Sequence, residues 1–189
     1  MSLLTHSAQA GQLNRICAWT LLVLSVLTLV WSVFQLVGVL ALEAWDVRSW
    51  FATYNLVPSG LLGWIAAHAT GLSALQLLSC IPCLAIAAGM LRGRNWARRG
   101  FIVLLLLTAL LNLAAVPLLD RLLMGMLDML LAQSSEFSSQ DDLAQIKSEL
   151  RDTRIMLWVS SSLPILALSA IHVWLAQRYR KADMRALFG

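Results

Sequence analysis

The sequence predicts an all-α integral membrane protein, a four-helix bundle with a helical hairpin that extends its third and fourth spans outside the membrane. Of its 189 residues, 59% are apolar and 13% are charged, whereas a soluble domain is roughly half apolar and a quarter charged. The apolar residues gather in runs long enough to cross about 30 Å of hydrocarbon. The segment between the last two runs keeps a helical pattern on both sides of a polar turn. Together these observations predict a single membrane domain over residues 1–189.

The predicted spans are residues 16–42, 72–91, 101–119 and 155–176. The first run is much longer than the roughly 7–15-residue apolar core of a cleavable signal peptide. Arg15 is the only Lys or Arg that precedes it. We therefore expect this run to be retained as a membrane span.

Basic residues gather beside the spans on one predicted side of the membrane. In the loop and the C-terminal tail they are Arg92, Arg94, Arg98, Arg99, Arg178, Arg180 and Lys181. The loops 43–71 and 120–154 carry fewer or diluted positive charges, with seven acids in the second loop. Because Lys and Arg favour the cytoplasmic side, both termini are predicted to be cytoplasmic in a bacterial inner membrane.

The short loop "LRGRNWARRG" joins the second and third spans. Gly93 is expected to end the second span in a left-handed conformation, and Trp96 suits the headgroup level. The arginines are expected to contact anionic lipid of the cytoplasmic leaflet. A specific phosphate site is the alternative, although no glycine-rich phosphate loop accompanies the arginines. The net charge of +4 lies in two short clusters, which does not predict nucleic-acid binding.

Gly93, Trp96, Ala97 and Arg98 form a Gly-x-x-Trp-Ala-Arg turn between the second and third spans. This turn resembles one that recurs in small, uncharacterised bacterial four-span membrane proteins. The resemblance implies a bacterial inner membrane and carries no activity with it.

The first external loop, 43–71, is rich in aromatic residues, which favour the membrane interface. We expect a short interfacial helix, a turn at Pro58, and a helical lead into the second span. An aromatic belt is the simpler interpretation of this loop, and a ligand-stacking site is the alternative.

The second external loop, about 120–154, is predicted to form the hairpin. On its second helix Leu143, Ile146, Leu150 and Leu157 lie on one face, with acids on one flank and basic residues on the other. Such a seam is typical of a coiled coil. Two arrangements remain open, a parallel homodimer through this helix or packing against the 120–132 extension of the same chain.

Neutral polar residues recur at a similar depth in all four spans. They are Gln35, Gln76, Asn112, Ser160, Ser161 and Ser162. A layer of this kind fixes helix packing through interhelical hydrogen bonds, or it lines a small cavity that opens outward.

Cys80 and Cys83 form a C-x-x-C pair within the second span, the spacing used by thiol oxidoreductases. Four-span quinone-linked disulfide enzymes look similar in outline, but they need a second cysteine pair in an external loop, which this sequence lacks. Packing is the alternative role of these thiols. The spans carry no charged residue between their ends, which disfavours a pump. His68 and His172 are expected near opposite faces of the membrane, too far apart to share a metal. No metal, cofactor or catalytic residue is predicted.

These features predict a non-catalytic multi-pass inner-membrane protein. It is expected to bind or position a membrane or periplasmic partner protein through the external hairpin and the aromatic loop. The alternative is a small channel or facilitator with an outward-facing polar cavity. A thiol redox membrane enzyme is the third and weakest hypothesis.

Overall fold

The computed structural model describes residues 2–188 apart from 48, 50–52, 54–59 and 135–139. For residues 2–7, 127–134 and 140–150 it describes the backbone alone. Within this part of the chain the structure is helical and contains no strand. The named helices are α1 (Ser2–Ala44), α3 (Gly60–Ala67), α4 (Ala69–Leu91), α5 (Asn95–Ser134), α6 (Gln140–Tyr179) and α7 (Ala182–Arg185).

Four helices are long and apolar enough to cross a membrane. Their candidate spans are Ala8–Ala44, Ala69–Leu91, Asn95–Met126 and Arg151–Tyr179. The prediction of an all-helical chain with four long apolar helices is therefore confirmed, and each helix contains one predicted span.

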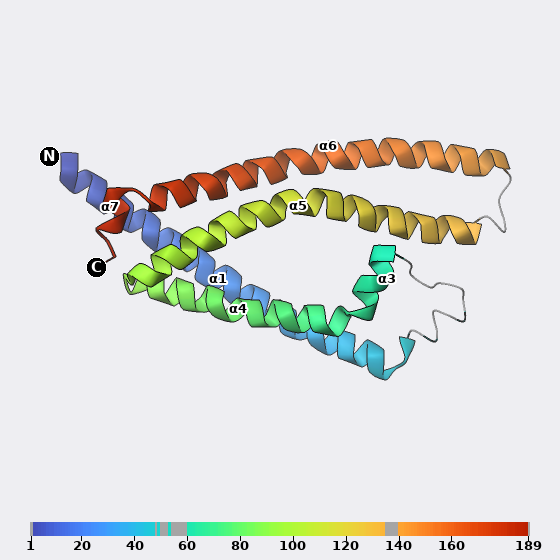
Figure 1. Cartoon of the computed structure of the whole chain (residues 1–189), viewed down its shortest axis with the longest axis horizontal. Helices are drawn as coiled ribbons and strands as arrows, with labels where there is room; N and C mark the ends of the chain where they lie inside the picture. Colours follow the sequence, from blue (N-terminus) through green and yellow to red (C-terminus); the bar gives the residue numbers. More distant parts are fainter. Residues whose placement is uncertain (1, 48, 50–52, 54–59, 135–139, 189) are drawn as a thin grey trace.

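The long helices form two packed pairs rather than one evenly packed bundle. α1 lies along α4, and α5 lies along α6, while α4 and α5 meet mainly near the turn that joins them (Figure 1). From that turn the two pairs diverge, and α3 lies between their separated parts and contacts α5 (Figure 1). Both termini lie at the end where the pairs meet. We call this end, with the 92–94 turn and α7, the basic end, and the opposite one the hairpin end.

The α1–α4 pair packs through small side chains. Ser25 and Ser32 on α1 and Ser73 and Cys80 on α4 are buried and are spaced seven residues apart on each helix. Lipid tails are as apolar as the spans, so helices in a membrane associate through close packing instead of the hydrophobic effect. Small residues at heptad spacing allow such close packing.

A buried cluster at the basic end joins both pairs. Its aromatic centre is Tyr179 of α6, whose ring is 4.9 Å from that of Phe101 in an edge-on arrangement. Met184 of α7 and Phe188 are buried in the same cluster, beside Met90 of α4 and Ala18 of α1. The segment after α6 thus folds back onto the end where all long helices begin or finish.

At the hairpin end, α5 and α6 run beyond the predicted spans. α5 continues through Pro117 to Ser134, and α6 begins at Gln140. The backbone is therefore helical on both arms of the predicted hairpin. In the loop before α4, α3 supplies the predicted helical lead, while most of the predicted interfacial helix lies outside the described residues.

Candidate functional site

The α4–α5 turn is a tightly packed structure. Gly93 adopts a left-handed backbone with φ of 66°, as predicted, and a Cβ there would lie 3.1 Å from the Leu187 carbonyl oxygen. A Cβ at Gly89 would lie 2.6 Å from the Ala97 Cβ and 2.9 Å from the Trp96 ring. Ala97 is fully buried, and the exposed part of Trp96 amounts to 49%. The Gly-x-x-Trp-Ala-Arg turn is thus a packing element as well as a charged loop.

Arg98 differs from the other arginines of this turn. It is 9% exposed, whereas Arg92, Arg94 and Arg99 are exposed. Its Nη1 donates to the Tyr179 carbonyl oxygen at the end of α6 over 3.1 Å, and its Nε and Nη2 donate to Asn95 Oδ1. Arg98 was expected at the lipid headgroups, but its guanidinium instead caps the last turn of α6, where free carbonyls favour a cation.

Asn14 extends this network to the other helix pair. Its Nδ2 donates to the Met90 carbonyl oxygen over 3.3 Å, and its Oδ1 accepts from the Tyr179 hydroxyl over 3.3 Å. Asn14 and Tyr179 are not among the residues that the sequence predicts to be functional. Their position as polar groups beside long apolar runs was a signal, but nothing in the sequence identified their partners.

The basic residues of the C-terminal tail also fall into two groups, one held by a partner within the protein and one exposed. Arg178 pairs with Asp183 over 2.6 Å. Partial burial alone would raise the pKa of the Asp183 carboxyl, but the Met184 N–H and the Arg178 guanidinium hold this pKa below its usual value. Arg180 and Lys181 are exposed, as a headgroup role requires.

The predicted polar layer does not form interhelical hydrogen bonds among the described side chains. Ser160 and Ser161 donate to the Leu157 carbonyl, and Ser162 donates to the Trp158 carbonyl, all within α6. Gln35 is exposed, whereas Gln76 and Asn112 are half-buried. Gln35 and Gln76 lie on one helix pair, and Asn112 and the serines lie on the other.

The cysteines are free thiols, with Cys80 buried and Cys83 half-buried. Cys80 Sγ donates weakly to the Gln76 carbonyl oxygen over 3.5 Å, and it lies in the small-residue seam against α1. Packing therefore accounts for Cys80. In the part of the chain that is described, no cluster of His, Cys, Asp and Glu could hold a metal ion.

The base of the hairpin is held by a two-point ion pair. Arg154 Nε donates to Asp120 Oδ1 and Arg154 Nη2 donates to Asp120 Oδ2, both over 2.6 Å. This fork geometry fixes the orientation of the two helices as well as their separation. Of the predicted seam, Leu157 is half-buried. Leu143, Ile146 and Leu150 have side chains outside the described residues, so the seam remains a prediction.

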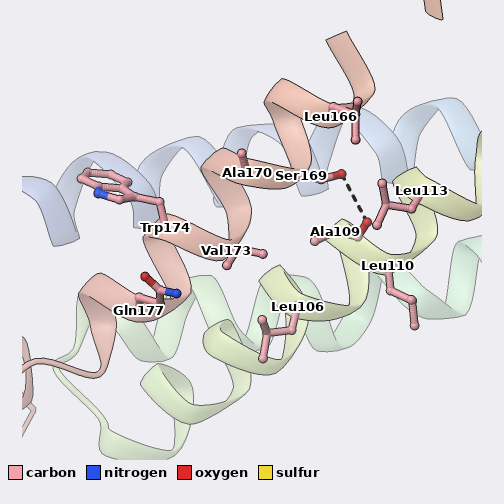
Figure 2. Close-up of a pocket in the computed structure, with 10 residues that line it drawn as sticks. All are labelled: Leu106, Ala109, Leu110, Leu113, Leu166, Ser169, Ala170, Val173, Trp174 and Gln177. Carbon is pink, nitrogen blue, oxygen red and sulfur yellow. Dashed lines mark hydrogen bonds between the residues drawn. The ribbon is translucent and has the colours of Figure 1, made fainter. Parts of the chain in front are cut away.

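A lateral groove of about 570 Å³ runs between α5 and α6 (Figure 2). Its walls are mostly aliphatic, with Leu106, Leu110 and Leu113 from α5 and Leu166 and Val173 from α6. Ser169 donates to the Ala109 carbonyl oxygen between the two helices over 3.3 Å. Trp174 and Gln177 lie toward one end of the groove (Figure 2).

Comparison of the chain with protein-family models, curated proteins and solved structures finds no match.

Proposed function

We propose that this chain is a non-catalytic multi-pass protein of the bacterial inner membrane that binds or positions a partner protein through the hairpin of α5 and α6. The observation that carries the proposal is the two-point Asp120–Arg154 pair at the hairpin base. A helix pair that is held in one orientation before binding loses less conformational freedom when a partner docks.

The length of the two arms supports the same proposal. α5 continues from Asp120 to Ser134, and α6 runs from Gln140 to Arg154, so each arm extends about 20 Å past the ion pair at 1.5 Å per residue. A connection between adjacent helices needs only about 2–8 residues. Arms of this length offer a surface that the membrane spans themselves do not require.

Crosslinking in intact membranes, followed by mass spectrometry, tests the proposal. Deleting 124–150 should preserve membrane insertion and abolish partner crosslinks. Asp120→Arg should also reduce the crosslinks, because it places two cations against each other at the base. The exchanged pair Asp120→Arg with Arg154→Asp should restore them.

The exchanged pair is the matched control, since it carries the same substitution at Asp120 with the attraction restored. A deletion variant that inserts normally and keeps the full set of crosslinked partners would overturn the proposal. Normal crosslinking by the single Asp120→Arg variant would remove the observation on which it rests.

The channel or facilitator alternative gains no specific support. It requires polar side chains from several helices to converge on one cavity, whereas the described serines of the predicted layer donate to their own helix. The thiol redox alternative also gains no specific support, because packing accounts for Cys80.

A further inference from the structure

The α5–α6 groove is aliphatic along most of its length and more polar at the end nearer the basic end of the molecule. Along it, Leu106, Leu110 and Leu113 face the aliphatic side chains of α6, including Leu166 and Val173. The amphipathic Trp174 and the polar Gln177 lie toward the basic end of the groove (Figure 2). This order, aliphatic along the groove and amphipathic at its mouth, matches the order of an acyl chain and its interfacial region.

The register of the two helices places cations at that end of the α5–α6 pair. Arg98 reaches the Tyr179 carbonyl and Ser169 reaches the Ala109 carbonyl, which fixes how the antiparallel helices are aligned. Arg99 therefore lies level with the end of α6, where Arg180 follows. Arg99, Leu106 and Leu113 are seven residues apart on α5, so they lie on one helix face.

These cations are available for a ligand. Arg99, Arg180 and Lys181 are exposed, and no side-chain hydrogen bond or ion pair holds them within the described part of the chain. Arg98 and Arg178, by contrast, are occupied by Tyr179 and Asp183. The structure thus separates the basic residues that hold the fold from those that remain exposed at the basic end of α5 and α6.

We propose that the α5–α6 groove binds one phospholipid with an anionic headgroup. One acyl chain lies along the aliphatic groove, and the phosphate lies among Arg99, Arg180 and Lys181. Charge complementarity at the mouth selects an anionic lipid over a zwitterionic one with the same tails. The site is independent of the hairpin, since it lies at the other end of α5 and α6.

The headgroup half of the proposal is tested with the full-length protein in detergent, by native mass spectrometry with phosphatidylglycerol and phosphatidylcholine of identical acyl chains. Arg99→Gln with Arg180→Gln should weaken phosphatidylglycerol binding about thirtyfold, at somewhat over fivefold per cation. Phosphatidylcholine binding should weaken much less, because its choline cation already offsets the charge of its phosphate. Arg121→Gln with Arg151→Gln is the matched control at the hairpin end, and it should bind as the natural protein does. Equal losses in both double variants, or no loss in the first, would overturn the site.

The tail half is tested by filling the groove. Ala167 and Ala170 are both exposed on α6, but only Ala170 lines the groove. Ala170→Phe should weaken binding of both lipids at least about tenfold, while Ala167→Phe should leave both unchanged. Ala170→Leu, a smaller insertion, should give an intermediate loss if the phenylalanine variant proves unstable.

Unchanged lipid binding by both Ala170 variants would contradict a tail in the groove. If the natural protein instead forms a lipid-free dimer that Ala170→Phe dissociates, the groove seats a second copy of the chain and the lipid proposal is wrong.

Discussion

Neighbouring arginines of one turn have different surroundings because consecutive helix residues point about 100° apart. Arg98 points inward to the end of α6, whereas Arg99 is exposed on the face that continues into the groove. The sequence predicts a basic turn with a left-handed Gly93, and the structure has both. The sequence does not distinguish Arg98 from Arg99, because their difference depends on how α6 approaches α5.

Replacing Arg98 should therefore cost more stability than replacing Arg99. Arg98→Ala should lower the free energy of unfolding by about 1.5–3 kcal/mol, the usual loss for hydrogen bonds to a charged group. Arg99→Ala should change it by less than about 0.5 kcal/mol, as at other exposed positions. Unfolding in mild detergent, followed by tryptophan fluorescence, measures both, and equal effects would show that the cap on α6 is not stabilising.

Two glycines of α4 should respond in opposite ways to alanine. Gly89→Ala brings a methyl group within 2.6 Å of the Ala97 Cβ, and overpacking of this kind costs about 1–3 kcal/mol. Gly71 has open space around its Cβ position, so Gly71→Ala should stabilise the helix by about 0.5–1 kcal/mol. The same unfolding experiment compares them, and a stabilised Gly89→Ala variant would mean that the α4–α5 contact is looser than described.

At the scale of helices, the hydrophobic runs predict well that each of the four long helices exists, but they predict less well where each helix ends. The predicted span 72–91 ends where α4 ends, at Leu91. The span 101–119 underestimates α5, which begins at Asn95 because the part of the arginine-rich segment that follows the 92–94 turn is itself helical. The pairing of α1 with α4 and the folding back of α7 were not predicted. The pairing depends on small residues such as Ser73 and Cys80, and the folding back depends on where Met184 and Phe188 pack, which a hydrophobic run does not reveal.

The ion pair at the hairpin base should control the order of both arms. Asp120→Asn removes a charge from the fork with Arg154, so amide hydrogens of α5 and α6 near this pair should exchange several-fold faster through local opening. Asp152→Asn is the control, because Asp152 is exposed on the same arm. Hydrogen–deuterium exchange in detergent or nanodiscs gives the comparison, and identical exchange in the two variants would show that the pair does not hold the arms together.

Across the whole molecule, close packing between the two helix pairs is concentrated at the basic end. Phe101 there is 5% exposed, whereas Phe34 on α1 is 70% exposed. Phe101→Ala should lower the free energy of unfolding on the order of 2 kcal/mol, near the low end for buried large-to-small substitutions, because only packing is lost in lipid or detergent. Phe34→Ala should have little effect, and a similar loss at both positions would indicate that the pairs close into one bundle in the membrane.

Orientation underlies both the partner-binding proposal and the predicted location of the termini. In a background without Cys17, Cys80 and Cys83, single cysteines in place of Arg94 and Arg121 report the basic end and the hairpin end. A membrane-impermeant maleimide added to spheroplasts, which lack the outer membrane but keep a sealed inner membrane, should label position 121 and reach position 94 only after the inner membrane is permeabilised. Labelling of position 94 in sealed spheroplasts, with position 121 protected, would place the hairpin in the cytoplasm and contradict the proposed orientation.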